Sequence, residues 1–420
     1  MHPLLRREIA GVPVAELARE FGTPTYVYDA RQIEQRIADL AAFDVIRFAQ
    51  KANSNLAVLD LCRRRGVLVD AVSAGEIHRA LLAGYPTQGD PPPIVYTADV
   101  FDRESLELVV EYGIAVNCGS PDMVDQYAER RAGAPAEIAL RVNPGFGHGH
   151  SRKTNTGGES SKHGIWWEDV AEVRARAEQR GLAVTTLHMH IGSGVDLEHL
   201  ALVAGALERC AAEAGPGVRT ISTGGGLPVP YRRGDPRIDI GRHFAIWDAS
   251  RKRLEDRFGH RVRLEIEPGR YLVAEAGFLV TEIRAIKRMG GNTFYLVDAG
   301  FNALARPVLY GSYHPMSIAP ADATPRAERD VVVGGPLCES GDIFTQEEGG
   351  VVRSERLPEA RVGEHLVIEH AGAYGFVMSS NYNSKPQPAE VLIREGKAHL
   401  VRARQTLGDL VRGESIPALD

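Results

Sequence analysis

Several groups suited to chemistry follow short apolar runs of this 420-residue sequence. Lys51 follows the run at 45–49, His190 closes a run near 184–191, three glycines stand at 224–226, and Glu267 ends the run at 263–267. A desolvated lysine amine loses its proton more readily and attacks carbonyl groups. Consecutive glycine N–H groups approach phosphates closely, an imidazole stacks on planar rings, and a carboxylate keeps a ring nitrogen protonated. Together these residues predict a Schiff base between Lys51 and a planar, phosphorylated carbonyl cofactor.

Eight short β-branched runs alternate with amphipathic helical stretches between residues 45 and 280. This alternation is typical of βα units that form a parallel sheet. Its length matches a TIM-like (β/α)8 barrel, in which active-site groups lie at the carboxyl ends of the strands. We expect that barrel over residues 30–279, and the groups named above at one of its faces. The predicted strands are 45–50, 67–71, 94–97, 114–117, 137–142, 184–191, 218–223 and 263–267.

After residue 277 the sequence changes to alternating strands interrupted by Gly and Pro. That sequence pattern predicts an all-β domain, of the β-sandwich or Greek-key type. We assign residues 280–420 to it, together with the N-terminal segment 1–29, for which the residues themselves do not decide between the two domains. The predicted strands include 293–297, 330–333, 365–369, 391–394 and 399–402.

The composition excludes several classes of protein. With 49 Lys and Arg against 55 Asp and Glu, the net charge is −6, which offers no broad cationic surface for nucleic acid. No apolar run approaches the length of a membrane span. The four cysteines are far apart and form no C-x-x-C pair, so we expect reduced thiols and a cytoplasmic protein, and no secretory signal is recognisable at the N-terminus.

Two features have competing interpretations. His188 and His190 share one face of a predicted strand, which is compatible with a metal pair, but no third ligand has matching spacing, and we expect no metal. The segment 144–164, rich in Gly, Ser, His and Lys, is long for a barrel loop and is predicted to be a mobile lid. His148 and His150 within it are expected to be solvated.

The motifs in this chain resemble those of the fold-type III pyridoxal-phosphate-dependent decarboxylases, and among them the enzymes acting on diaminopimelate. Pyridoxal phosphate needs a protonated ring nitrogen to act as an electron sink, which agrees with the groups named above. The order and spacing of the whole set are more specific than any single motif. The set comprises FGTPTYVYD at 21–29, FAQKAN at 48–53, HIGS at 190–193, GGG at 224–226, EPGR at 267–270, DAGFN at 298–302, Arg306 with Pro307 and Tyr310, GPLCESGD at 335–342 and GAYG at 372–375.

The resemblance implies a role for each matched residue. Lys51 forms the Schiff base, His190 stacks on the cofactor ring, Glu267 pairs with its nitrogen, and Cys338 donates the proton after carbon dioxide leaves. The phosphate is surrounded by Ser193, Gly224, Gly225, Gly226, Gly269, Arg270 and Tyr374, and Asp70, Arg141 and Pro268 are expected near the cofactor. The substrate is bound by Arg270, Arg306, Tyr310, Glu339 and Tyr374.

The reaction implied is decarboxylation of meso-2,6-diaminopimelate to L-lysine and CO2, in a homodimer whose partner subunit presents Cys338 and Glu339. The unreacting end of that substrate carries both charges, which Arg306 and Glu339 match. Alternatives are a related decarboxylase acting on ornithine, lysine, arginine or a modified amino acid, an amino-acid racemase, a pyridoxal-phosphate carrier protein and a zinc-dependent barrel hydrolase. Cys338, Tyr310 and Tyr374 also have purely structural interpretations, as a buried thiol and core aromatics. Ala74 and His163 depart from the family pattern, which has glycine and phenylalanine there.

Overall fold

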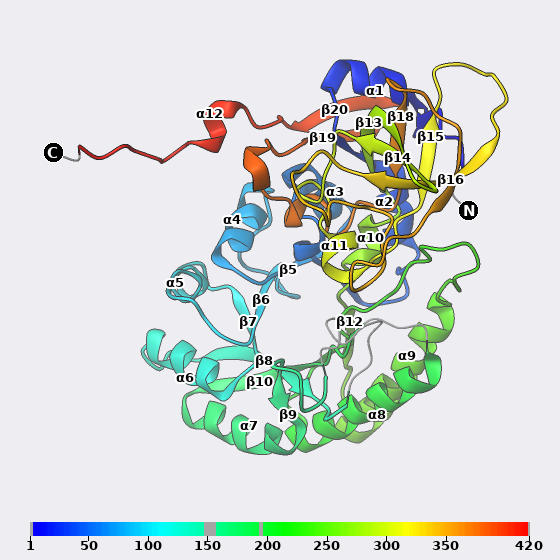
Figure 1. Ribbon diagram of the computed structural model, residues 1–420. Coiled ribbons are helices and arrows are strands. Elements are labelled where there is room, and N and C mark those ends of the chain that lie inside the picture. The colour runs from blue at the N-terminus through cyan, green and yellow to red at the C-terminus, as the bar shows by residue number, and fades with distance from the viewer. Residues whose placement is uncertain (1–2, 147–156, 193–195, 419–420) are drawn as a thin grey trace. The chain divides into compact units, whose positions relative to one another are not determined.

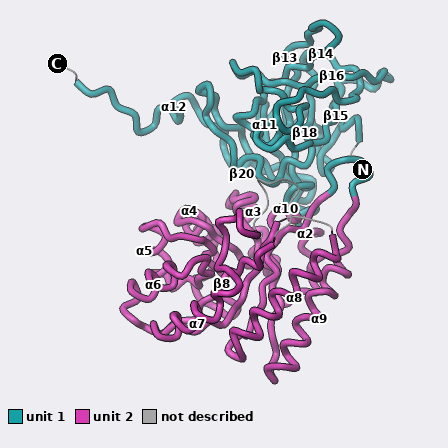
Figure 2. The backbone as a smooth tube through the Cα atoms, turned by 60° about the horizontal axis from the view of Figure 1, so that its bottom comes forward, with its two compact units in different colours: residues 1–33, 230–235, 273–420 teal, residues 34–229, 236–272 magenta. Residues whose placement is uncertain are grey.

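The computed structural model describes residues 3–146, 157–192 and 196–418 (Figure 1). Ser193, His148 and His150, and residues 147–156 of the predicted lid, lie outside the described residues. The chain forms two compact units, one of residues 34–229 and 236–272, the other of residues 1–33, 230–235 and 273–420 (Figure 2). Every helix in the described part of the chain is too short or too polar to cross a membrane.

The first unit is built on a closed barrel of eight parallel strands, which confirms the predicted fold. The barrel closes because β10 pairs with both β8 and β11, and β12 pairs with β4. An additional two-residue strand, β9 (Ile165–Trp166), pairs in parallel with the end of β8. The barrel strands are β4 (Val45–Ala49), β5 (Leu68–Ala71), β6 (Ile94–Ala98), β7 (Ala115–Cys118), β8 (Ala136–Asn143), β10 (Leu182–His188), β11 (Thr220–Ser222) and β12 (Arg263–Ile266).

Helices follow the barrel strands and surround them (Figure 1). Many begin at a polar side chain that accepts a backbone N–H of the first turn, as Ser73, Asp102 and Ser120 do. These caps fix where each connection ends, and hence where the strand-end loops lie. The helices are α2 (Ala30–Ala38), α3 (Leu56–Arg64), α4 (Ala74–Leu82), α5 (Arg103–Tyr112), α6 (Pro121–Arg130), α7 (Val170–Gln179), α8 (Leu197–Ala214), α9 (Ile240–Phe258) and α10 (Arg270–Val273).

The second unit contains a mixed sheet, which confirms the predicted β domain. Its central strand β13 (Gly277–Met289) pairs antiparallel with β3 (Thr25–Asp29), β14 (Asn292–Val297) and β18 (His365–Ile368). The pairs β3–β19 and β14–β16 are parallel. The remaining strands are β1 (Glu8–Ile9), β2 (Val12–Pro13), β15 (Met316–Ala319), β16 (Glu328–Gly334), β17 (Glu355–Pro358), β19 (Ala389–Arg394) and β20 (Lys397–Arg402), and the helices are α1 (Val14–Phe21), α11 (Arg306–Tyr310) and α12 (Leu407–Leu410).

The apolar core of this sheet joins residues from both ends of the chain. Val14 and Leu17 of α1 pack with Val27 of β3, Val280 of β13 and Val391 of β19, all buried. The N-terminal segment is therefore part of the second unit's core.

Candidate active site

Glu267, directly after β12, is a buried carboxylate with two hydrogen-bond donors. His188 Nε2 lies 2.9 Å from its Oε2, and the Ser222 hydroxyl donates to its Oε1 at 2.9 Å. Burial alone would raise the pKa of Glu267, but His188, the Arg47 guanidinium and the Ser222 hydroxyl lower it to about 2. The group is thus a fixed anion at the carboxyl end of the barrel.

The His190 imidazole is held as a neutral ring beside the glycine run. The Gly225 N–H donates to His190 Nδ1 at 3.2 Å, so this nitrogen is an acceptor. Burial, with the positive charges of Arg141 and Lys51, holds the pKa of His190 well below its usual range. A neutral imidazole in a fixed orientation offers a flat face to a ring.

At positions 224–226 the neighbouring atoms lie too close to the backbone for any residue larger than glycine. A Cβ on Gly224 would lie 2.6 Å from His190 Cβ, one on Gly225 would lie 2.4 Å from the Glu267 carbonyl oxygen, and one on Gly226 would lie 2.2 Å from the Gly192 carbonyl oxygen. All of these distances are shorter than side-chain contacts allow. The run is therefore a backbone surface in which no larger residue fits, next to His190 and Glu267.

Lys51 lies in the short 3-10 helix Gln50–Ala52 after β4, beside the segment that follows Glu267. The Ala49 N–H donates to the Pro268 carbonyl at 3.1 Å, and a Cβ on Gly269 would touch Ala49 and Ala52. Lys51 itself is exposed. The desolvation expected from the apolar run before it is therefore wrong, because β4 ends at Ala49 and Lys51 lies in the 3-10 helix that follows, with an exposed side chain between buried neighbours.

Asp70 and Arg141 are both buried at the ends of their strands. Burial and the nearby Glu267 charge raise the pKa of Asp70 to about 6, and its Oδ1 has no hydrogen-bond partner. Burial lowers the pKa of Arg141, against the opposing effects of Asp99, Glu267 and Asp70. Burial likewise raises the pKa of Glu76, beside Lys51 and Asp70, to about 7. The barrel thus brings the predicted cofactor residues into one electrostatically coupled cluster, with Arg270 partly buried directly after Gly269.

In the second unit, Arg306 is a buried guanidinium at the start of α11, only 5% exposed. It donates to the Tyr231 hydroxyl at 3.1 Å and the Ser312 hydroxyl at 3.3 Å, and its Nη1 lies 2.9 Å from His314 Nε2. His314 Nδ1 in turn lies 3.1 Å from the Glu369 carbonyl oxygen, which makes Nε2 the acceptor and the ring neutral. These three partners hold the Arg306 side chain in place.

Cys338 and Glu339 form the exposed tip of a loop whose base is held by hydrogen bonds. The buried Asp342 carboxylate accepts the Leu337 N–H at 2.8 Å and the Phe301 N–H at 2.7 Å, which fastens the base of the loop. The Cys338 N–H donates to Asn383 Oδ1 at 2.7 Å. Because Cys338 is exposed, its alternative interpretation as a buried thiol is wrong.

Tyr310 and Tyr374 are both partly exposed, at the end of α11 and in the loop before Phe376. Tyr374 has φ of 56°, a backbone conformation that is strained for a tyrosine and is found mainly where surrounding structure imposes it. Its neighbour Gly375 leaves no room for a Cβ, which would lie 2.3 Å from the Ala371 carbonyl oxygen.

The sequence does not indicate the supporting residues. Its pattern predicts His188 only as a possible metal ligand, whereas His188 binds Glu267 together with Ser222. Nothing in the spacing indicates a carboxylate partner far along the chain. Other supporting residues that were not singled out are Tyr231, Ser312 and His314 around Arg306, and Asn383 and Tyr382 beside the loop tip.

Comparison with known proteins identifies the class. Residues 30–274 match the family model described as pyridoxal-dependent decarboxylase, pyridoxal binding domain. The chain is 54% identical to diaminopimelate decarboxylase of Streptomyces coelicolor, over 99% of this chain and 94% of that protein. It is 52% identical to the Escherichia coli protein of the same name, over 94% of each chain.

Solved structures agree with the sequence comparison. A crystal structure of diaminopimelate decarboxylase superposes with a TM-score of 0.93, at 50% identity and 98% coverage of both chains. The Helicobacter pylori enzyme, crystallised with L-lysine, gives 0.83 at 31% identity, covering 95% of this chain and 98% of that one. The chain belongs to the family of diaminopimelate decarboxylases.

The barrel cluster fits pyridoxal phosphate, the cofactor of this family. Glu267 is a buried anion suited to a protonated ring nitrogen, and His190 is neutral and flat. The glycine run exposes backbone where any Cβ would collide. Lys51 lies on the adjoining segment, with an exposed amine.

Proposed function

We propose that this chain decarboxylates meso-2,6-diaminopimelate to L-lysine and carbon dioxide. The observation that carries the substrate is the buried Arg306 guanidinium, because a distal carboxylate would form charge-assisted hydrogen bonds with it. The names of the relatives and the L-lysine bound to the Helicobacter pylori enzyme support the same reaction.

Each residue of the barrel cluster has a separate task in this proposal. Lys51 anchors the cofactor through its amine, Glu267 Oε1 and Oε2 hold a proton on the ring nitrogen by charge, and His190 orients the ring. The phosphate is bound beside the glycine run 224–226, with Ser193, Gly269, Arg270 and Tyr374. Asp70, Arg141 and Pro268 complete the surroundings. When bound, pyridoxal phosphate supplies the electron sink for the pair left by departing carbon dioxide.

Cys338 Sγ holds the proton that replaces the lost carboxylate, and acts as a general acid. Arg306 and Glu339 bind the carboxylate and the ammonium of the unreacting end, with Arg270, Tyr310 and Tyr374 contributing further contacts. We propose that the active enzyme is a homodimer in which Cys338 and Glu339 serve the partner's site. The exposed, rigidly fastened loop tip supports this, because it is presented outward from its own unit. The reduced, separated cysteines agree with a cytoplasmic location.

A related decarboxylase for ornithine, lysine or arginine is the alternative. Those substrates lack the distal carboxylate, so they would not pair with the buried Arg306 guanidinium. Such a mismatch lowers kcat/KM by up to about 10⁴-fold. The test is carbon dioxide release by the pyridoxal-phosphate-loaded enzyme from meso-diaminopimelate, L-lysine, L-ornithine and L-arginine in parallel.

We expect release from meso-diaminopimelate alone, with L-lysine as the product. Release from another substrate alone would refute the role of Arg306 while leaving the cofactor assignment intact. The control is Lys51→Ala, which is expected to remove the visible absorbance of the bound cofactor as well as turnover. Retained absorbance in that variant would contradict the cofactor assignment itself.

A further inference from the structure

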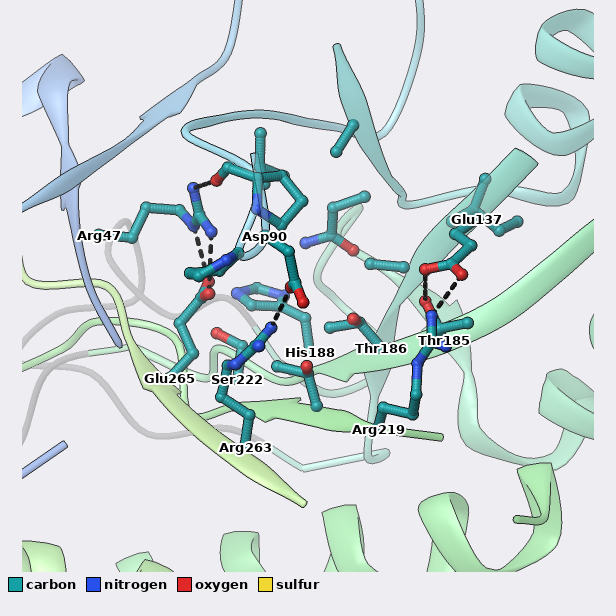
Figure 3. Close-up of a pocket in the computed structure, with 18 of the residues that line it drawn as sticks. Arg47, Asp90, Glu137, Thr185, Thr186, His188, Arg219, Ser222, Arg263 and Glu265 are labelled. Atoms are coloured by element: carbon teal, nitrogen blue, oxygen red, sulfur yellow. Dashed lines mark hydrogen bonds and ion pairs between the residues drawn. The ribbon is translucent and has the colours of Figure 1, made fainter. Parts of the chain in front are cut away.

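A cavity of about 770 Å³ enters the barrel from the amino-terminal ends of its strands (Figure 3). Its mouth is open to solvent, since the side chains of Asp90 and Arg261 are 82% and 76% exposed. Ion pairs surround the mouth, between Arg263 and Asp90 at 2.9 Å, Arg261 and Asp44 at 2.6 Å, and Arg219 and Glu137. This opening lies at the face of the barrel opposite the strand-end cluster.

Small residues form part of the walls below the mouth. The interior of a TIM barrel is ordinarily filled by layers of large branched side chains. Here Ala115, Ala139 and Thr186 are among the residues that line the cavity, and the register pairs Ala139 with Thr186 directly. The Arg47 side chain, also in the lining, is held by a bidentate ion pair with Glu265, at 2.7 and 2.9 Å. The axis of the barrel therefore stays open.

The inner end of the cavity is formed by Glu267 and the two residues that bind its carboxylate. His188, Ser222 and Glu267 all line it, whereas Lys51, His190 and the three glycines are described residues outside its lining. His188 uses Nε2 for Glu267, and among the described residues its Nδ1 has no hydrogen-bond partner although the residue is only 2% exposed. The buried Asn117 Oδ1, also in the lining, has no partner in the described part of the chain either. Figure 3 shows His188 near the centre of the residues drawn, close to Ser222.

Unpartnered polar atoms on a roomy, polar cavity are where proteins hold water. We propose that this cavity binds a chain of water molecules that ends on His188 Nδ1 and connects the His188–Glu267 pair with solvent at the amino-terminal mouth of the barrel. The proton of the His188–Glu267 pair then exchanges with solvent through the amino-terminal cavity. This exchange does not depend on whether cofactor or substrate is bound at the carboxyl ends of the strands. The charged groups acting on this pair are Arg47, Asp70 and Arg141, together with Glu265 bound to Arg47.

The test compares two substitutions at one position of the cavity wall in the pyridoxal-phosphate-loaded enzyme. Ala139→Leu fills the passage with apolar atoms, and Ala139→Ser leaves it open and polar. The readout is the exchange rate between water and the His188 imidazole proton, measured by NMR on protein labelled with 15N-histidine. The His188 signal is assigned by its loss in His188→Gln.

We expect Ala139→Ser to exchange like the unsubstituted enzyme and Ala139→Leu to exchange at least about tenfold more slowly, because exchange then requires local opening of the barrel. Equal rates in the two variants would overturn the proposal. A high-resolution crystal structure of the unsubstituted holoenzyme is the second measurement, which does not depend on the variants folding. Ordered water on His188 Nδ1 and along the passage supports the proposal, and an empty or blocked passage refutes it.

Discussion

Replacing Ser222 with alanine removes one of the two hydrogen-bond donors to the buried Glu267 carboxylate. The hydroxyl donates at 2.9 Å, and Ser222 is only 1% exposed. A hydrogen bond to a charged group is worth about 1.5–3 kcal/mol. In a unit of this size each kcal/mol moves the midpoint of thermal unfolding by about 2–4 °C. We expect Ser222→Ala to lower the unfolding temperature of the barrel at neutral pH by roughly 5 °C.

The pH dependence of this loss distinguishes charge from packing. The pKa of Glu267 is lowered from 4.5 to about 2 on folding, so its anion stabilises the fold above pH 4.5, and that stabilisation is lost as the pH falls towards 2. In Ser222→Ala the pKa of Glu267 lies closer to 4.5, so the variant has less of this stabilisation to lose. The difference between the two proteins is therefore largest above pH 4.5 and shrinks on acidification.

The assay is thermal unfolding of both proteins across this pH range, with Thr281→Val as the control. The Thr281 hydroxyl is buried and donates to a neutral group, the Leu366 carbonyl, at 2.8 Å. The control is expected to lose about 1 kcal/mol at every pH. If the loss in Ser222→Ala were equally constant, or grew on acidification, the electrostatic account of Glu267 would be refuted.

Four further predictions concern the rest of the proposed site. Gly225→Ala should weaken pyridoxal phosphate binding to the apoprotein by about tenfold or more in a fluorescence titration, because overpacking costs about 1–3 kcal/mol, whereas Gly205→Ala inside α8, with only Arg209 at 3.7 Å, should leave affinity unchanged. Because burial raises the pKa of Asp70 to about 6, Asp70→Asn should raise the unfolding temperature above pH 6 and change it little below pH 4, and a gain confined to acidic pH would contradict the sign. Cys338→Ala should keep the cofactor's absorbance and lose most turnover, and normal turnover would exclude the thiol as proton donor. Arg306→Lys should reduce kcat/KM for meso-diaminopimelate about 10–100-fold through lost charged hydrogen bonds, and unchanged kinetics would remove it from the substrate site.

The sequence predicts the barrel well because its signals are local. Each strand is a short apolar run closed by a polar cluster, and the run before Lys51 gives β4 to within one residue. The predicted convergence of Asp70, Arg141, His190 and Glu267 follows from parallel strand topology alone. The exposure of Lys51 could not be predicted, because it depends on the turn taken after Ala49.

The sequence predicts less of the second unit, since its sheet depends on long-range pairing. Strand β13 is buried on both faces up to Ile283 and then exposed, so it shows no alternation that marks a strand. The hydrogen-bond partners of Arg306 include Tyr231, which lies in a separate segment of the chain, and His314. No spacing rule connects such residues before the fold is known.

Strand β3 lies between β13 and β19 in the second sheet, with Tyr28 opposite Gly277 on one side and beside Leu392 on the other. During synthesis β3 leaves the ribosome before the barrel strands, β13 is made only after them, and β19 is made close to the end of the chain. The barrel can close in the meantime, and contacts so distant in sequence form slowly. Until β19 has been made, one edge of β3 stays open to pairing with other nascent chains. Loss of the last few dozen residues would therefore leave an open strand edge near the other end of the chain, and aggregation of such fragments would begin there.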